Sequence, residues 1–450
     1  MRVLLISTYE LGRQPVHLAG PAAALRESGH EVRVVDLSVS PLEDEDITWA
    51  ERVAVSVPMH TATRLADEVV AALRELRSDL PVAFYGLYAA VGAEPVAARF
   101  EGEYEPALLA WADGGESGAV RHLGRSDFAA PDRVGLPDLG EYARLEHRGA
   151  NVLVGAVEAS HGCRHRCRHC PIPAVYDGRM RVVPPDLVVA DIDRLVAAGA
   201  GHITFGDADF LNAPAHSLAV LERAHRTHPE VSFDATIKVE HILDHRNLWP
   251  RLAEMNLLFV VSAFESVDGP TLDVLDKGHT VDDMSEAVAV TRESGVHIRP
   301  TWLPFLPWTT PEDVAGIFTF IDDHDLAGAT DPVQMAIRLL IPPGSLLEDH
   351  PAVVPYRRGY DDRSLTWAWD FAEPETAVLQ KELETIAADA SDCGQEALQT
   401  LNEMREVVAR RSGISLAPIS AFTPVPRLTE SWFCCAEPTR SQSVSIRGRR

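Results

Sequence analysis

Short apolar runs alternate with amphipathic stretches along the first part of the chain. The apolar runs are Val3–Ile6, Val32–Leu37, Val53–Val57 and Val82–Tyr85. Their length and their content of Val, Ile and Leu are typical of buried strands. Residues 15–28 begin at a proline and end before Gly29, and residues 65–76 are amphipathic, so both stretches predict helices. Strands that alternate with helices predict a doubly wound, Rossmann-like α/β domain over residues 1–117.

A second α/β region follows a stretch that is rich in Gly, Pro and charge. That stretch, residues 118–150, predicts a linker. The strand candidates of residues 151–350 are Val152–Ala159, His202–Gly206, Val231–Ile237, Leu257–Ala263, Val296–Leu303 and Val333–Leu340. Helices are expected between them, at 186–198, 243–255 and 311–323. Six β/α units are two fewer than a full TIM-type (β/α)8 barrel contains, and sites on barrels of this type lie at the carboxyl ends of the strands.

The last hundred residues or so predict a helical extension and a tail. Residues 351–425 hold apolar side chains at helical spacing, and residues 426–450 contain Trp432-Phe-Cys434-Cys435-Ala-Glu-Pro438. Adjacent cysteines form a strained, redox-active disulfide or a soft ligand pair for thiophilic atoms. We therefore expect Cys434 and Cys435 to be a catalytic redox or substrate-binding element. The alternative is a chance pair of small apolar side chains.

Composition and charge narrow the classes of partner. The 450 residues are 46% hydrophobic and 24% charged, which is ordinary for a soluble globular protein. A formal net charge of −26 argues against nucleic acid as the main partner. No run is long and apolar enough for a membrane span or a signal peptide, so we expect a cytoplasmic protein without a membrane partner.

The strongest chemical signal is the segment Cys163-Arg-His-Arg-Cys167-Arg-His-Cys170, directly after the first barrel strand. Three thiolates can hold three corners of a [4Fe–4S] cube and leave one iron open to a second molecule. A zinc site is an alternative, because His161, His165 and His169 lie nearby. A disulfide framework is not favoured, since six cysteines in 450 residues are too few.

This cysteine spacing resembles that of the radical S-adenosylmethionine (SAM) superfamily. The resemblance implies a partial (β/α)6 barrel, a [4Fe–4S] cluster on Cys163, Cys167 and Cys170, and reductive cleavage of SAM to a 5′-deoxyadenosyl radical. It also implies a small-molecule substrate and a reductant such as flavodoxin or ferredoxin.

Residues after the later strands are candidates for binding SAM. Gly206-Asp207 matches the Gly-Glu-like pair with which the family meets the SAM ammonium group, with Asp in place of Glu. Lys238 could pair with the SAM carboxylate and Glu240 with ribose hydroxyls. The alternatives are a βα turn at Gly206-Asp207 and a salt-bridged strand end at the other two.

Three further candidates follow the fourth and sixth strands. Ser262 and Glu265 bring a small polar group and a carboxylate to one strand end. Arg338 would face the barrel interior, where a buried guanidinium needs an anionic partner such as a carboxylate of SAM or substrate. A structural ion pair is the alternative.

Residues 1–117 resemble the cobalamin-binding domain that often precedes radical SAM barrels. Its ligand loops would fall at Ser56-Val-Pro-Met-His60, Tyr85-Gly86-Leu87 and Gly114-Gly115-Glu116. The D-x-H-x-x-G motif that carries the lower cobalt ligand is missing, and Tyr9-Glu-Leu-Gly12 stands there instead. Cobalamin is therefore in doubt: the domain binds it without a histidine, or it has become a scaffold or substrate-binding domain.

The Cys-Cys-Ala-Glu-Pro ending resembles the CUAEP/CCAEP-tail radical SAM proteins, some of which carry selenocysteine where Cys435 stands. The resemblance implies a nucleophilic or redox role for that position, and it extends over the leading domain, the cysteine loop and the tail. Paired C-terminal cysteines also occur in radical SAM enzymes of arsenic metabolism, which suggests a thiophilic substrate.

Three functions remain open from the sequence. The first is a radical SAM enzyme in which Cys434 and Cys435 provide hydrogen atoms or electrons, or hold the substrate. The second is a cobalamin-dependent radical SAM methylase. The third is a metal-binding regulatory protein without enzyme activity, which uses the same cysteines for zinc.

Overall fold

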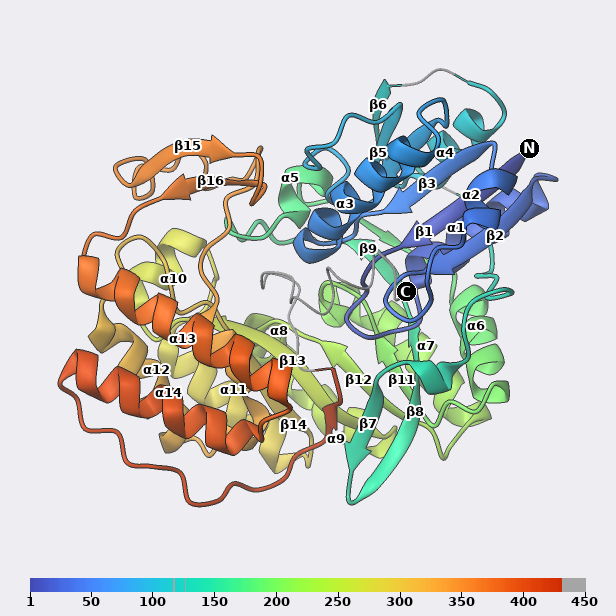
Figure 1. The fold of residues 1–450 in the computed structure, drawn as a ribbon. Coiled ribbons are helices and arrows are strands. Elements are labelled where there is room, and N and C mark those ends of the chain that lie inside the picture. Colours follow the sequence, from blue (N-terminus) through green and yellow to red (C-terminus); the bar gives the residue numbers. More distant parts are fainter. Residues whose placement is uncertain (116–117, 126, 431–450) are drawn as a thin grey trace.

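The computed structural model describes residues 1–115, 118–125 and 127–430 of the chain. Figure 1 shows two α/β units. The N-terminal domain is at the upper right, and a curled half-barrel lies below it. Two long C-terminal helices, α13 and α14, cover the left flank. The α/β fold, with one parallel and one mainly parallel sheet, confirms the predicted fold class.

The N-terminal domain is a six-stranded parallel sheet in the order β2-β1-β3-β4-β5-β6. Its strands are β1 (Arg2–Ser7), β2 (Glu31–Asp36), β3 (Arg52–Ser56), β4 (Val82–Tyr85), β5 (Ala98–Gly102) and β6 (Gly118–His122). Its helices are α1 (Val16–Glu27), α2 (Asp44–Trp49), α3 (His60–Leu76) and α4 (Glu105–Ala112). The order of the first five strands is that of flavodoxin-like folds. The strand β6 lies in the stretch where the sequence predicts a linker.

Both faces of this sheet are buried, because successive strand residues point to opposite faces. Leu4 and Val53 belong to the apolar cluster on the face that α3 covers. Leu5 belongs to the cluster on the other face, with Leu18 of α1 and Trp111 of α4. The four apolar runs predicted as strands are β1 to β4. The predictions missed β5 and β6, whose sequences mix charged residues with few apolar ones.

The half-barrel is a seven-stranded sheet in the order β14-β13-β12-β11-β8-β7-β17. Its parallel strands are β8 (Ala150–Val157), β11 (His202–Phe205), β12 (Ser232–Thr236), β13 (Leu257–Glu265) and β14 (His297–Trp302). At one edge, β7 (Arg144–His147) and β17 (Arg427–Leu428) continue it in antiparallel pairing. Its helices are α6 (Pro185–Ala197), α7 (Pro214–Thr227), α8 (Val239–Asp244), α9 (Trp249–Glu254), α10 (Gly269–Leu275), α11 (Val281–Glu293) and α12 (Pro311–Asp323).

The sixth barrel strand, expected at 333–340, is not formed. Pro332–Ala336 is a 3-10 helix, and only one parallel bridge, between Phe305 and Arg338, continues the sheet there. Proline at the start of this segment fixes its φ and removes an amide donor, which favours a turn over a ladder strand. The parallel half-barrel therefore has five regular strands and one bridge in the described part of the chain.

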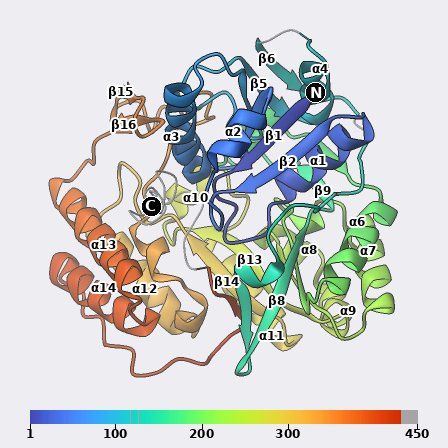
Figure 2. The same cartoon turned by 45° about the vertical axis from the view of Figure 1, so that its right-hand side comes forward.

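Smaller elements complete the chain. They are β9 (Ser160–Gly162), β10 (Met180–Val182), α5 (Ile172–Tyr176), β15 (Arg357–Asp361), β16 (Thr366–Trp369), α13 (Pro374–Cys393) and α14 (Ala397–Ser412). The hairpin β15–β16 precedes the two helices where the sequence predicts only a helical extension. Figure 2 shows α6 and α7 on one flank of the half-barrel and α13 and α14 on the opposite flank. None of the helices in the described ranges has the length and apolar composition that a bilayer crossing requires.

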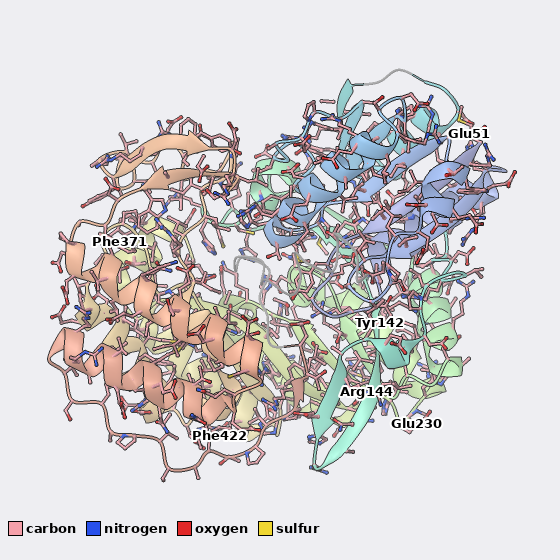
Figure 3. The ribbon with its side chains drawn as sticks, viewed as in Figure 1. Glu51, Tyr142, Arg144, Glu230, Phe371 and Phe422 are labelled. Atoms are coloured by element: carbon pink, nitrogen blue, oxygen red, sulfur yellow. The ribbon has the colours of Figure 1, made fainter. Side chains whose placement is uncertain are left out.

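The segment between the two sheets is tied to both. Arg133 donates to Gln14 Oε1 of the first domain at 2.9 Å and to both carboxylate oxygens of Asp191 on α6 at 3.0 and 2.7 Å. Tyr142, labelled in Figure 3, lies between the N-terminal domain and β7. Next to it, the Ala143 amide donates to Gly12 O at 2.8 Å. These contacts place the carboxyl edge of the first sheet above the carboxyl end of the half-barrel.

Candidate functional site

The three cysteines lie on one loop at the carboxyl end of the first barrel strand. The loop joins β9 to α5, and Cys163, Cys167 and Cys170 are free thiols that are partly buried. The side-chain amide of Asn212 donates to Cys163 Sγ at 3.3 Å. Burial and the neighbouring cysteines raise the pKa of the Cys163 thiol and raise that of Cys170 to about 12. A bound metal would be needed to keep these sulfurs as thiolates at neutral pH.

The cysteine loop is anchored to the strand and helix on the far side of the half-barrel. Arg168 donates from its amide to Leu275 O at 2.9 Å and from Nη1 to Val274 O at 2.8 Å. His169 places Nε2 3.0 Å from Glu265 Oε1, at the end of β13. The cysteines are therefore held by residues that are about a hundred positions away in the sequence.

Glu265 is the buried centre of this anchor. Its Oε1 also receives Nζ of Lys277 at 3.2 Å, and both of these side chains are less than a tenth exposed. Burial by itself would raise the pKa of Glu265, but Lys277 and His169 outweigh it and lower the pKa to about 2. Its backbone has φ +68°, a left-handed conformation that a residue with a Cβ rarely adopts.

Both carboxylate oxygens of Asp207, a predicted SAM ligand, accept hydrogen bonds from the protein itself. Its Oδ2 accepts from the Ala159 amide at 2.9 Å and its Oδ1 from the Ser160 hydroxyl. Burial raises the pKa of this carboxyl to about 6. The adjacent Gly206 is exposed to the cleft described below. A SAM contact through Gly206 and Asp207 stays a prediction. The alternative is that Asp207 only holds the segment at Ala159 and Ser160 in place.

Lys238 and Glu240, the second predicted pair, form an ion pair with 2.6 Å between Nζ and Oε2. The segment is not extended as expected, because α8 begins at Val239 and Lys238 is its N-cap. Lys238 Nζ also lies 3.1 Å from Nδ1 of His165 in the cysteine loop. The pair therefore stands beside the cysteines, and its contact with SAM stays a prediction.

Ser262 and Arg338 complete the predicted set. Ser262 is fully buried, and its hydroxyl makes no hydrogen bond within the described ranges. The guanidinium of Arg338 lies 4.2 Å from the ring centre of Trp369 and donates to its carbonyl at 3.2 Å. Ser262 is thus a buried hydroxyl near the end of β13 that has no hydrogen bond to a described residue. Arg338, in contrast, already stacks on Trp369 and donates to its carbonyl.

Three side chains from separate elements converge beside the cysteine loop, and sequence reasoning named only one of them, His165, as a possible zinc ligand. They are His165, Asp209 and His241, whose ligand atoms lie within 4.8 Å of one another. Asp209 follows the predicted pair by two residues, and His241 follows Glu240 directly. Their positions just after strand ends were the available signal, but nothing in the sequence shows that they meet.

A large cleft separates the carboxyl edges of the two sheets. It encloses about 1040 Å³ of non-atom space, part of it open to solvent. Residues of the first domain that line it include Leu11, Met59 and Gly86, after β1, β3 and β4. Residues of the half-barrel include Gly206 and Ala208, and the segment Ser160-His161-Gly162 that leads into Cys163 also lines it. The cleft therefore lies next to the cysteine loop.

Charged groups from both domains meet in one wall of this cleft. His17 contacts Glu10 of its own domain and lies 3.6 Å from Glu158 of the half-barrel. His161 of the half-barrel lies 3.1 Å from Glu103 of the first domain. Burial alone would lower the pKa of His17, but the two carboxylates outweigh it and raise the pKa to about 9. The network thus joins the domains by ion pairs across the cleft.

The tail cysteines cannot be placed beside this site. Cys434 and Cys435 lie outside the described residues, and their catalytic role stays a prediction.

Residues 157–321 match the radical SAM superfamily model. The hopanoid C-2 methylase of Rhodopseudomonas palustris is 23% identical over 313 residues, which cover 66% of this chain and 57% of that protein. The hopanoid C-3 methylase of Methylococcus capsulatus is 21% identical over 322 residues, which cover 66% of this chain and 62% of that protein. The match thus spans about three fifths of the length of these two curated relatives.

Two solved structures share the fold. The cobalamin-dependent SAM radical enzyme OxsB, with aqua-cobalamin bound, gives a TM-score of 0.65 at 14% identity and covers 92% of this chain and 71% of its own. The radical SAM methyltransferase TsrM from Kitasatospora setae, with cobalamin and a [4Fe–4S] cluster bound, gives 0.55 at 20% identity and covers 72% and 70%. The first of these likenesses extends over both domains.

Residues 157–321 therefore form a radical SAM domain, and this domain together with the methylase relatives supports an enzyme of the radical SAM class. This class implies a [4Fe–4S] cluster and SAM. The site fits such a cluster, since three free cysteines share one loop and an amide donor already points at one of the sulfurs. The alternative of a regulatory protein without enzyme activity is not supported.

Proposed function

We propose that this protein is a cobalamin-dependent radical SAM methylase, the second of the functions left open by the sequence. The observation that carries the proposal is the cleft between the carboxyl edges of the two sheets, bordered by the segment that leads into Cys163. In flavodoxin-like folds ligands bind at this edge of the sheet. The methylase relatives and the two cobalamin-containing structures support the same assignment.

Cys163, Cys167 and Cys170 would hold the cluster. With SAM bound, the cluster supplies the electron that cleaves the sulfonium. The half-barrel residues proposed to hold SAM are Gly206, Asp207, Lys238, Glu240, Ser262, Glu265 and Arg338. Lys238 and Glu240 contact the cysteine loop through His165, and Glu265 contacts it through His169.

Cobalamin was in doubt from the sequence because the histidine motif is missing, and the comparisons make it plausible instead. Cobalamin, when bound, supplies a cobalt centre that can carry a methyl group. Small residues line both walls of the cleft: Gly86 and Gly102 on the first domain, Gly206 and Ala208 on the half-barrel. Leu11, in the loop that lacks the histidine motif, lines the cleft without offering a metal ligand.

A thiophilic substrate is supported less well than this methylase function. The comparisons name no thiophilic substrate and do not bear on the CCAEP-type ending. A small-molecule substrate and an electron donor of the flavodoxin or ferredoxin type belong to the proposal. Cys434 and Cys435 remain proposed as its redox or substrate-binding element.

Anaerobic reconstitution tests the proposal. The protein is loaded with iron, sulfide and hydroxocobalamin and passed through a gel-filtration column. We expect about four irons and one cobalt per chain, and transfer of label from methyl-deuterated SAM to bound corrinoid under reducing conditions. Loss of all corrinoid on the column would overturn cobalamin dependence. Unchanged SAM cleavage after Cys163→Ser, Cys167→Ser or Cys170→Ser would overturn the cluster assignment.

A matched pair of variants locates the corrinoid. Ala208→Trp puts a large side chain into the cleft, and Ala198→Trp makes the same change at an exposed position after α6. We expect Ala208→Trp to weaken corrinoid binding at least roughly ten-fold while iron content stays unchanged, because binding needs space for the ligand. Ala198→Trp should bind as the unaltered protein does. Equal binding by both variants would place the corrinoid elsewhere.

A further inference from the structure

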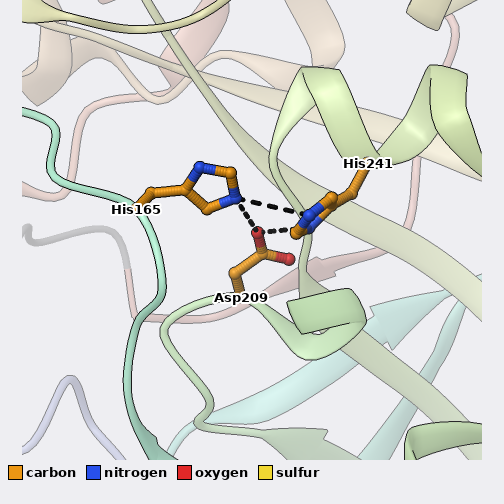
Figure 4. Close-up of side chains that lie close together, drawn as sticks. All are labelled: His165, Asp209 and His241. Carbon is orange, nitrogen blue, oxygen red and sulfur yellow. Dashed lines mark hydrogen bonds and ion pairs between the residues drawn. The ribbon is translucent and has the colours of Figure 1, made fainter. Parts of the chain in front are cut away.

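Three potential metal ligands from three separate elements meet beside the cysteine loop, as Figure 4 shows. His165 comes from the loop itself, between Cys163 and Cys167. Asp209 is the N-cap of the short 3-10 helix Phe210–Asn212 after β11, and His241 lies on α8. The set is distinct from the three sulfurs, and nothing in the proposed methylase function uses it.

The distances between these atoms suit one shared ion. Nε2 of His165 lies 3.3 Å from Nε2 of His241 and 3.8 Å from Oδ2 of Asp209. Two nitrogen ligands on a tetrahedral zinc ion with bonds of about 2.05 Å are about 3.3 Å apart. The two imidazoles therefore already stand at the separation of two ligands.

One oxygen of the buried Asp209 carboxylate faces both imidazoles. Asp209 is 2% exposed, and its Oδ1 accepts from the Leu211 amide. Its Oδ2 lies 2.7 Å from Nδ1 of His241 and 3.8 Å from Nε2 of His165. A buried carboxylate that faces two imidazoles favours a positive charge at this point, which a bound cation would supply.

We propose that His165, Asp209 and His241 bind a divalent transition-metal ion of the zinc class, separately from the iron–sulfur cluster. Two imidazoles and one carboxylate are ligands that Zn²⁺ and neighbouring divalent ions accept. Three protein ligands leave at least one coordination position open to water or to a bound molecule. The site needs no cysteine.

The ammonium of Lys238 competes with a metal ion for the imidazole of His165. Its ammonium can only donate, so while it bonds Nδ1 of His165 at 3.1 Å, the ring hydrogen of a neutral His165 must be on Nε2. A nitrogen that carries hydrogen cannot bind metal, so occupancy requires Lys238 to turn away from His165. Glu240, 2.6 Å from the same ammonium, can hold it there. Metal binding and the Lys238–His165 bond therefore exclude each other.

Zinc analysis of the cluster-containing full-length protein tests the site. The reconstituted protein is incubated anaerobically with zinc sulfate, desalted and analysed for both metals. We expect about one zinc per chain beside the cluster iron. Asp209→Asn and His241→Ala should reduce zinc at least ten-fold with iron unchanged. Lys238→Met should lower the apparent dissociation constant roughly five-fold or more, because a nearby positive charge is removed.

His245→Ala is the matched control, since His245 follows the same helix and its ring lies 5.8 Å from that of His241. Its zinc content should equal that of the unaltered protein. Zinc X-ray absorption should show nitrogen and oxygen ligands only, and a sulfur shell near 2.3 Å would mean that zinc has replaced iron at the cysteines. That outcome, absence of zinc, or full zinc retention in Asp209→Asn overturns the proposal. Because cobalt content and SAM cleavage are measured separately, such a failure leaves the proposed methylase function standing.

Discussion

Nε2 of His169 lies 3.0 Å from Oε1 of Glu265, and this contact fastens the residue before the third cysteine to the end of β13. The carboxylate is buried and also pairs with the buried ammonium of Lys277. A strand end thereby fixes a loop that would otherwise be free to move between its cysteines. The left-handed backbone of Glu265 indicates that this geometry is imposed by its surroundings.

Removal of the Glu265 carboxylate should destabilise both the fold and the cluster loop. Glu265→Ala leaves Lys277 as an unpaired buried charge, and breaking such a pair costs about 3–5 kcal/mol. We expect a loss of that size in the free energy of unfolding, measured by urea denaturation, and lower iron retention after gel filtration. Glu286→Gln serves as control, because Glu286 pairs with Arg246 at the surface and should matter by less than about 1 kcal/mol. Equal effects of the two substitutions would contradict the anchoring role.

The ion pair of Lys277 with Glu265 is a part of the site that could not be predicted from the sequence. Lys277-Gly-His-Thr280 reads as an ordinary helix–loop feature, since a phosphate loop would contain more glycine. In the fold, the side chain is 3% exposed and neutralises Glu265. Local sequence cannot reveal this partnership, because it depends on how α10 closes against β13.

Lys238 should contribute to SAM binding if the predicted contact is made. Lys238→Met removes an ammonium that bonds both Glu240 and His165. We expect SAM affinity of the cluster-loaded protein to fall roughly ten-fold, the loss of one charge-assisted hydrogen bond. Equilibrium dialysis with labelled SAM measures it.

The control for this change is Lys381→Met, which breaks an exposed pair with Glu384 on α13. It should leave SAM affinity unchanged. If Lys238→Met binds SAM as tightly as the control does, Lys238 is only a partner of Glu240 and His165, as the alternative interpretation holds.

The contact between the two domains should weaken at alkaline pH. The pKa of His17 is raised from 6.5 to about 9 by Glu10 and Glu158 against the effect of burial, with His161 opposing them. A raised pKa stabilises the fold fully below pH 6.5, and this contribution is lost as the pH rises through 9. The pKa of Glu158, which burial would raise, is lowered from 4.5 to about 2, so its contribution is lost only as the pH falls through that value.

Urea denaturation at about pH 5.5, 7.5 and 9.5 measures this dependence. The free energy of unfolding should fall by up to about 3 kcal/mol between the first and the last pH, and His17→Gln should flatten the fall. His228→Gln is the control, since His228 pairs with Asp193 outside the cleft. A pH profile that His17→Gln does not change would exclude the interdomain pair as its source.

Much of the fold followed from apolar periodicity, and the exceptions have physical reasons. The strands β1 to β4 and the helix Pro311–Asp323 lie where the sequence predicted them, because each has a buried apolar face and clear end signals. The expected sixth strand fails at Pro332 although its residues are apolar. The cysteine loop was found from spacing alone. The convergence of His165 with His241 required the fold, since 75 residues separate them and His241 lies outside the cysteine motif.

Arg133 should couple the two domains through its forked hydrogen bonds. It bonds both oxygens of Asp191, which is 2% exposed, and also Gln14 Oε1 and Ala156 O. Lysine cannot reproduce a planar fork, so Arg133→Lys leaves part of a buried carboxylate unsatisfied. We expect a loss of about 2–4 kcal/mol in the free energy of unfolding, with calorimetry resolving separate transitions for the N-terminal domain and the half-barrel.

Arg358→Lys, which alters an exposed pair with Asp370, should cost less than about 1 kcal/mol and keep the original transition. If Arg133→Lys melts as that control does, the domains are held together chiefly by the cleft network around His17.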